Sequence, residues 1–378
     1  MPKSKTDRSR RHFLLGAAAL GLTAPSLAAA PAEEAPRRED TINDWIRQQA
    51  DKAPLALRFR GRTAEEGRKW QTEFATRLRS LLGPHAPPAK WKTVTRNSVD
   101  LDDHRREELR LEAEGHPPLP VYLLLPRRKS DKPRPGVLAI HGHGSHGHHP
   151  VAGRDDLPGV AKAIKSCQYD YGRQLARRGY VVAVPCLTPF GVRLGKRDAY
   201  GKQDACAITF LRLQMLGKLL IAENLRDCLW ALELLARHPK VNAERLGCVG
   251  LSYGGRMSML TAALEPRIRI AIVSGALNVM QERIAGPYSC GAQVIPGLLQ
   301  YGDVPEIGGL IAPRPAIWEA GSRDGLIKPR WAEDALTRIR RVYAALDAKD
   351  RLMVDRFDGG HEWSGRLAYP QLEKTLGG

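Results

Sequence analysis

The chain has 378 residues, of which 43% are hydrophobic and 26% are charged. That composition is ordinary for a globular protein able to bury a substantial core, and we expect disorder only at the ends. The formal net charge of +18 raises the question of nucleic-acid binding. The basic residues are scattered, however, without an aromatic-interleaved basic stripe or a zinc-finger or RNA-recognition signature, so nucleic acid is not an expected partner.

The first 32 residues have the layout of an export signal. The pair Arg10-Arg11 precedes a short apolar run at 13–22, and three alanines follow at 28–30. This layout resembles a twin-arginine signal, which carries folded proteins. The apolar run is too short for a hydrocarbon core that needs roughly 20 residues, so no stable membrane anchor is expected. We expect residues 1–32 to be a signal peptide read by the twin-arginine export machinery, and the mature protein to be periplasmic or secreted.

Residues 33–104 are expected to be a linker followed by an N-terminal helical cap. A helical pattern covers residues 63–82 and begins at a good capping residue, Thr63. Strand patterns at 107–113 and 120–125 then predict an antiparallel edge. We expect one catalytic domain, formed by residues 105–378.

From residue 136 onward, apolar strands alternate with amphipathic helices, which is typical of a mainly parallel sheet covered on both faces. The predicted strands are 137–141, 181–185, 246–251, 270–274, 316–320 and 352–357. The predicted helices are 216–235, 252–264, 331–346 and 369–376. Two stretches, 186–212 and 276–312, are expected to be inserted loops that shape a substrate pocket. The predicted fold class is α/β, with an N-terminal helical and antiparallel extension.

The segment Gly250-Leu251-Ser252-Tyr253-Gly254 is a Gly-x-Ser-x-Gly pattern, which says little when it stands alone. Here a buried-strand run precedes it and a helical pattern follows it directly. A nucleophile elbow requires this context, because the turn strains the serine backbone and larger flanking side chains would collide with the neighbouring strand and helix. We expect Ser252 to be a nucleophile. The alternative is a tight turn whose serine faces solvent.

A serine hydroxyl needs a general base, and the base needs a carboxylate that holds it in one tautomer. Asp324 follows one apolar strand and His361 follows the last one, which gives the order Ser, Asp, His expected for a fold of this kind. Asp358 is the competing acid, but it is too near His361 in sequence to orient the ring comfortably. His361 has no histidine rival downstream of Ser252.

Acyl transfer also needs backbone N–H groups aimed at the developing oxyanion. One is expected from Tyr253, at the start of the helix after the nucleophile. The other is expected from the loop that begins His141-Gly142-His143-Gly144, where we favour the N–H group of His143.

The same loop holds five histidines within nine residues, a pattern that is compatible with metal binding. Its alternating glycines predict a flexible loop, and the sequence offers no second ligand element from a carboxylate or cysteine. The six cysteines contain no Cys-x-x-Cys pair, although their even number leaves disulfides conceivable. They are Cys167, Cys186, Cys206, Cys228, Cys248 and Cys290. We therefore expect neither a metal site nor a cofactor.

Together these features resemble the dienelactone-hydrolase-like and acetyl-xylan-esterase-like branch of the α/β hydrolases. The resemblance covers roughly residues 105–375. It rests on the motifs at 138–144, 250–256, 290–298, 311–315 and 358–362. It implies the α/β-hydrolase fold, and it implies Ser252 as nucleophile, Asp324 as acid and His361 as base. It also implies the amides of His143 and Tyr253 as the oxyanion hole, and ester hydrolysis without a metal or organic cofactor.

One departure bears on the substrate, because a true dienelactone hydrolase has a cysteine nucleophile and this chain has Ser252. Removal of a small acyl group, such as deacetylation of a carbohydrate, is therefore favoured over opening of a lactone. We expect an exported serine hydrolase that cleaves carboxylic esters of a small molecule or carbohydrate.

Other functions share parts of this pattern. An exported peptidase of the same fold would use the same three residues, but no large recognition domain is evident. A halide- or epoxide-directed hydrolase is excluded, because it needs an aspartate in place of Ser252. A non-catalytic protein that kept the fold, and a metal-binding protein that uses the histidine-rich loop, are the alternatives from other classes.

Overall fold

The computed structural model describes residues 39–128, 130–196, 200–201, 203–285 and 290–377. The chain divides into a unit of residues 1–41 and a unit of residues 42–378. The predicted signal peptide lies outside the described residues. Among the described helices, none is long and apolar enough by itself to cross a membrane. Among them, only the consecutive helices α5 (Ala205–Met215) and α6 (Leu220–Ala236) are together long and apolar enough for a span, and the pair is bent by 97°.

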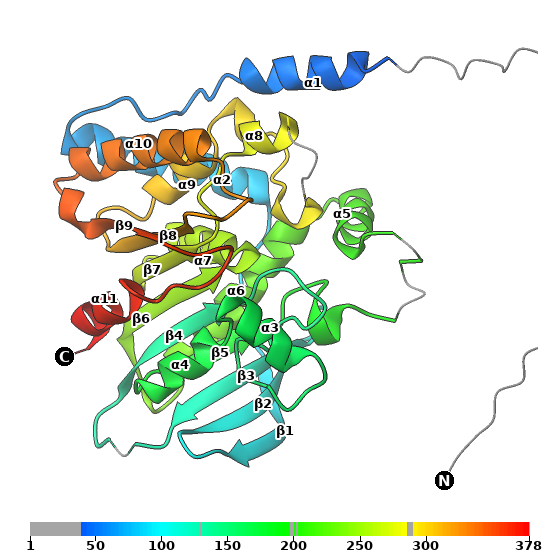
Figure 1. The fold of residues 1–378 in the computed structure, drawn as a ribbon, viewed down its shortest axis with the longest axis vertical. Helices are drawn as coiled ribbons and strands as arrows, with labels where there is room; N and C mark the ends of the chain where they lie inside the picture. The colour runs from blue at the N-terminus through cyan, green and yellow to red at the C-terminus, as the bar shows by residue number, and fades with distance from the viewer. Residues whose placement is uncertain (1–38, 129, 197–199, 202, 286–289, 378) are drawn as a thin grey trace, which may run out of the picture. The chain divides into compact units, whose positions relative to one another are not determined.

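A nine-stranded sheet forms the centre of the larger unit, in the order β1-β2-β3-β5-β4-β6-β7-β8-β9 (Figure 1). Its first four strands in this order pair antiparallel, and the strands from β5 to β9 pair parallel. The strands are β1 Lys92–Asp100, β2 His104–Glu112, β3 Leu119–Pro126, β4 Arg134–Ile140, β5 Val181–Pro185, β6 Val241–Leu251, β7 Ile268–Ser274, β8 Ala316–Gly321 and β9 Leu352–Phe357. The mainly parallel sheet and its antiparallel edge are thus confirmed.

Strand β1 extends the sheet beyond its expected start. Residues 92–100 were expected in the linker and helical cap, yet they pair with β2 over their whole length. The strand escaped prediction because it is an edge strand with polar side chains on both faces, so its sequence lacks apolar alternation. Its register shifts between Thr95 and Asn97, which leaves Arg96 as a bulge.

Helices cover both faces of the sheet, and each face has its own hydrophobic core (Figure 1). One core joins the sheet to α2, α6, α7, α9 and α10, and the other joins it to α4 and α11. Successive residues of β4 alternate between the two cores, as expected for a strand buried on both faces. The helices are α1 Thr41–Asp51, α2 Ala64–Leu82, α3 Val160–Cys167, α4 Tyr171–Arg177, α7 Tyr253–Leu264, α8 Met280–Ala285, α9 Val304–Gly309, α10 Pro329–Ala345 and α11 Ala368–Leu376.

Helix α2 confirms the predicted N-terminal helix. The hydroxyl of Thr63 accepts the N–H of Glu66, and the Glu66 carboxylate accepts the N–H of Thr63, which forms a capping box. Trp70, Phe74 and Leu78 recur at helical spacing and are buried against the sheet core. The helix therefore begins at a signal readable in the sequence, and its packing is set by its apolar stripe.

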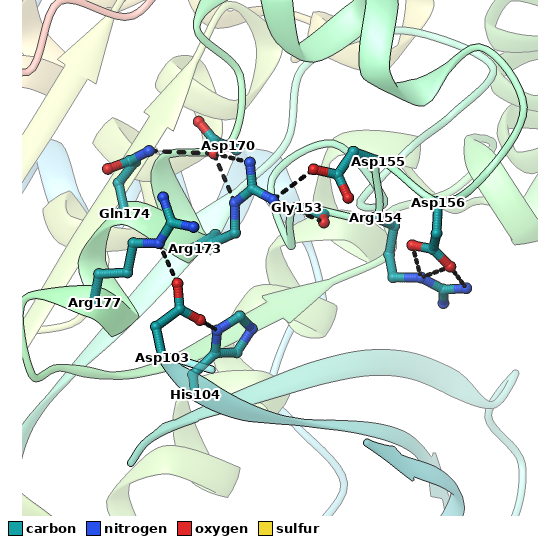
Figure 2. Close-up of polar contacts among 10 residues, drawn as sticks. All are labelled: Asp103, His104, Gly153, Arg154, Asp155, Asp156, Asp170, Arg173, Gln174 and Arg177. Atoms are coloured by element: carbon teal, nitrogen blue, oxygen red, sulfur yellow. Dashed lines mark hydrogen bonds and ion pairs between the residues drawn. The ribbon is translucent and has the colours of Figure 1, made fainter. Parts of the chain in front are cut away.

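The connection between β4 and β5 contains α3 and α4, which were not predicted, and its first part is the histidine-rich loop. Arginine side chains fix this connection: Arg173 is paired with Asp155 and Asp170, and Arg154 is paired with Asp156 (Figure 2). Arg154 also donates hydrogen bonds to two side chains of the sheet, Glu108 of β2 and Tyr122 of β3. These ion pairs anchor the residues that follow the histidine-rich loop, for which the alternating glycines predict flexibility.

Candidate active site

Ser252 lies in the one-residue turn between β6, which ends at Leu251, and α7, which begins at Tyr253. Its backbone has φ 63° and ψ −122°, a conformation that is strained for residues other than glycine. The Ser252 N–H donates to the carbonyl of Ser274 at the end of β7, at 2.9 Å, which helps to hold the turn. The predicted strand-turn-helix context is present.

Two glycines beside Ser252 are required by close contacts. A Cβ atom on Gly250 would stand 2.2 Å from the carbonyl oxygen of Gly254, and one on Gly254 would stand 2.0 Å from the carbonyl oxygen of Ile140. Both approaches are to backbone atoms, which cannot move aside cheaply. The glycines thus allow the helix after Ser252 to pack directly against β4 and β6, as expected for an elbow.

His361 and Asp324 lie in contact at the ends of two neighbouring strands, β9 and β8. Nδ1 of His361 is 2.7 Å from Oδ2 of Asp324, and Oδ1 of Asp324 accepts the N–H of Leu326 at 2.9 Å. Within the described residues, Nε2 of His361 is buried and has no hydrogen-bond partner. The carboxylate therefore fixes the ring, and Nε2 stays available to another group.

Asp358, the competing acid, points elsewhere. Its side chain is 83% exposed and forms an ion pair with Arg323. Asp324 is buried by contrast, so the structure brings Asp324 and not Asp358 to the imidazole of His361.

Ser252 and His361 line the same cavity of about 480 Å³. The other lining residues are His143, Tyr253, Gly275, Ala276, Asn278, Arg283, Gln293 and Leu326. Gly275 brings the ring close to the turn, since a Cβ atom there would stand 2.8 Å from Cε1 of His361 and 3.0 Å from Cδ1 of Leu251. The arrangement places a nucleophile candidate and a base candidate in one pocket at the carboxyl ends of the strands.

The loop after β4 also reaches Ser252, as the predicted oxyanion hole requires. A Cβ atom on Gly142 would stand 3.0 Å from Cβ of Ser252, so the backbone leading to His143 passes directly beside the turn. Tyr253 is the first residue of α7, where N–H groups lack an intrahelical acceptor. The backbones of His143 and Tyr253 therefore both border the Ser252 end of the cavity.

Histidine side chains in this loop serve its packing. Nε2 of His141 accepts the N–H of Leu187 at 2.9 Å, so Nδ1 carries the proton and donates to the carbonyl of Gly142 at 2.7 Å. Burial lowers the pKa of His141 to about 4. Tyr122 is hydrogen-bonded to Nδ1 of His149, and burial lowers the pKa of that ring to about 4 as well. His141 and His149 are therefore neutral near pH 7.

His143 meets two cysteines that the sequence places far away. Its Nε2 is 3.0 Å from the sulfur of Cys290, and one donor atom from each of His143, Cys206 and Cys290 lies within 4.8 Å of the others. The hydrogen bond with Cys206 lowers the pKa of the Cys290 thiol, with a further contribution from His143, and the same bond raises the pKa of the Cys206 thiol. Sequence spacing gave no sign of this cluster, because its members come from three separate segments.

The cavity wall holds polar groups that were not predicted either. Asn278 accepts a hydrogen bond from the buried guanidinium of Arg256 in α7, and burial lowers the pKa of Arg256 to about 10. Arg283 of α8 also lines the cavity and donates to the carbonyl of Leu326 at 3.0 Å. Both Asn278 and Arg283 come from the 276–312 stretch, which was expected to shape the pocket.

Comparison with known proteins finds similarity to one protein family and to one curated relative. Residues 155–283, which include the Ser252 turn, match the Dienelactone hydrolase family. A Bacillus subtilis protein described as a hydrolase, YtaP, is 29% identical over 304 residues, which cover 77% of this chain and 94% of that protein.

Solved structures share the fold. One from Bacteroides fragilis, assigned as an acetyl xylan esterase, has a TM-score of 0.72 at 17% identity and covers 90% of this chain and 96% of its own. A glucuronoyl esterase from Solibacter usitatus has a TM-score of 0.60 at 15% identity, covering 82% of this chain and 94% of its own. The chain therefore has the α/β-hydrolase fold, and part of it is similar to the Dienelactone hydrolase family.

Proposed function

We propose that this protein is a serine esterase that cleaves carboxylic esters through an acyl-enzyme. The observation that carries the proposal is the contact between Asp324 and His361, which leaves Nε2 of His361 without a partner among the described residues, in the cavity that Ser252 lines. A hydroxyl, an imidazole and a buried carboxylate in this order are the parts that nucleophilic acyl transfer needs.

In the proposed reaction, Nε2 of His361 accepts the Ser252 proton while Oγ attacks the ester carbonyl carbon. The carbonyl oxygen becomes an oxyanion, which the N–H groups of His143 and Tyr253 stabilise. His361 then gives its proton to the departing alcohol, and an acyl-Ser252 ester remains. Water, deprotonated by His361, attacks that ester and releases the carboxylic acid, which restores the Ser252 hydroxyl. Asp324 keeps the imidazole oriented and stabilises its charged form.

We further propose an acylated carbohydrate or small molecule as the substrate. The proposal is supported by the carbohydrate esterases among the structures of the same fold. It is also supported by the cavity, whose wall combines apolar Ala276 and Leu326 with polar Asn278 and Gln293. A pocket of mixed lining suits a ligand with both an acyl group and hydroxyl groups.

Covalent labelling tests the nucleophile. A fluorophosphonate should modify the wild-type protein at Ser252, and Ser252→Ala should lose both the label and ester hydrolysis. Ser258→Ala is the matched control, because Ser258 lies six residues further along the chain, within α7, and its hydroxyl donates to the carbonyl of Ile272 at 3.0 Å. Labelling that persists in Ser252→Ala, or ester hydrolysis that survives it, would overturn the proposal.

A substrate panel tests the ester class. Acetylated xylo-oligosaccharides, aryl esters of rising acyl length, lactones and peptide amides are compared by kcat/KM. The carbohydrate acetyl esters should be preferred. Cleavage confined to peptide amides would replace the esterase with a peptidase that uses the same three residues.

We also propose export by the twin-arginine route, which rests on Arg10-Arg11 and the apolar run after them. In cell fractionation the wild-type chain should reach the periplasm or the medium. Replacement of both arginines by lysine should leave it in the cytoplasm, whereas Lys3→Arg with Lys5→Arg should have no effect. Export of the double-lysine variant at the wild-type level would contradict this route.

A further inference from the structure

The proposed reaction uses the backbone N–H of His143, but it gives no role to the His143 ring or to the nearby thiols of Cys206 and Cys290. Nε2 of His143 lies 3.0 Å from Sγ of Cys290, and Sγ of Cys206 completes a group of three donor atoms within 4.8 Å of one another. His143 comes from the loop after β4, Cys206 from the first turn of α5, and Cys290 from the segment that follows α8. Three separate parts of the chain thus present soft ligand atoms to one point.

The chemistry of these donors selects a particular kind of metal ion. Thiolate sulfur and imidazole nitrogen are the ligands that Zn²⁺ prefers, with bonds of about 2.3 Å and 2.0–2.1 Å. In a tetrahedral site such bonds separate the donor atoms by about 3.5–3.8 Å, so small side-chain rotations suffice to form it. Two thiolates and a neutral imidazole also balance the charge of Zn²⁺. That neutrality suits this position, because Cys206 is 5% exposed and Cys290 is 4% exposed.

The surrounding structure holds the ligands in place. The His143 ring packs between Phe190, at 5.3 Å between centroids, and Tyr253, at 5.0 Å. The backbone N–H of Ala292 points to the sulfur of Cys290, which is a suitable outer-sphere contact for a thiolate. Helix α5 approaches the Cys290 segment so closely that a Cβ atom on Gly291 would stand 3.2 Å from the carbonyl oxygen of Cys206.

We propose that His143, Cys206 and Cys290 bind one Zn²⁺ ion, whose fourth ligand is water from the cavity that His143 lines. The ion ties the loop after β4 to both inserted stretches, 186–212 and 276–312. The first of these stretches already meets the loop through the hydrogen bond from the Leu187 N–H to His141 and through the packing of Phe190 on His143. Zinc binding does not rest on the proposed esterase function. Its effect on ester hydrolysis does, because the ion would hold the backbone beside Ser252.

Zinc content of purified, tag-free protein kept under a phosphine reductant tests the site. Elemental analysis after dialysis against micromolar Zn²⁺ should give one ion per chain, and Co²⁺ in its place should show sulfur-to-metal charge-transfer absorption. Cys206→Ser, Cys290→Ser and His143→Ala should each weaken zinc binding by more than about 100-fold, because loss of a ligand exceeds the roughly 10–100-fold cost of losing an outer-sphere partner. Cys186→Ser is the matched control.

Cys186 suits this purpose because it is a buried thiol of the same inserted stretch, and its sulfur donates to the carbonyl of Phe190 rather than to the cluster. Ser252→Ala should retain the zinc and lose ester hydrolysis, which separates failure of this proposal from failure of the proposed function. Reduced wild-type protein that binds no zinc and gives no cobalt charge-transfer band would overturn the proposal. So would a full zinc equivalent in folded Cys206→Ser and Cys290→Ser.

Discussion

A buried carboxyl group makes the stability of this fold depend on pH in a defined direction. Glu319 lies on β8 opposite Asp355 of β9, and its oxygens accept the N–H groups of Ser364 at 3.3 Å and Gly365 at 3.0 Å. Burial raises the pKa of Glu319 from its ordinary value of 4.5 to about 7. The unfolded chain therefore loses this proton at lower pH than the folded chain, so stability falls as pH rises from about 4.5 to about 7.

The magnitude follows from the shift. A difference of about 2.5 pH units between the two states corresponds to about 3 kcal/mol of unfolding free energy, of which about 2.5 kcal/mol develops between pH 5 and pH 8.5. Glu319→Gln removes this titration. It also replaces one of two acceptor oxygens with an amide NH₂, which costs about 1–3 kcal/mol at every pH. The informative quantity is therefore the change in the wild-type minus variant difference with pH.

Urea unfolding at pH 5 and at pH 8.5 measures that change. Relative to Glu319→Gln, the wild type should lose about 2.5 kcal/mol on going to the higher pH. Glu114→Gln is the control, because Glu114 is exposed in the folded chain and its replacement should leave the pH dependence unaltered. A wild-type minus Glu319→Gln difference that stays constant within about 1 kcal/mol would refute the reasoning.

Two further predictions concern the candidate site. Asp324→Asn should lower kcat for ester hydrolysis by about 10⁴-fold with little change in stability, since the imidazole loses its orienting carboxylate. Asp358→Asn should hydrolyse the ester like the wild type. Equal losses of kcat in steady-state assays of the two variants would contradict the assignment of Asp324. Gly254→Ala should destabilise the fold by about 1–3 kcal/mol and lower kcat by about 100-fold or more, because the new methyl group meets a carbonyl oxygen at 2.0 Å. Gly325→Ala, where a methyl group meets nothing within 4 Å, should change the melting temperature little, and similar melting curves for both glycine variants would count against the close-packed elbow.

The parallel part of the sheet was predictable because its strands are buried on both faces. Runs such as 270–273 and 316–318 are continuously apolar, and the glycines around Ser252 mark a backbone approach that no other residue allows. Asp324 follows β8 and His361 follows β9, and parallel strands bring their carboxyl ends to one edge. Those local signals are sufficient to place the three side chains on the same side of the sheet.

Other features could not be predicted from the sequence, for physical reasons. Helices α3 and α4 are short, so each carries too few turns to show a periodic stripe. The approach of Cys206 and Cys290 to His143 depends on how two inserted stretches pack above the sheet, and separation along the chain does not encode that packing. Anchoring of the histidine-rich loop likewise depends on Arg154, whose partners on β2 and β3 lie far away in sequence.

The polar edge strand β1 has a consequence for how copies of this protein meet. An open sheet edge exposes a row of unpaired N–H and C=O groups, to which a strand from another molecule can add. In β1 that row is interrupted by the bulge at Arg96, and charged side chains stand at both ends of the strand, Lys92 and Asp100, and at the bulge itself. A tenth strand would have to desolvate those charges and match a bent ladder. Concentrated solutions of the folded protein should therefore resist edge-to-edge association along β1, even though the sheet it terminates is large.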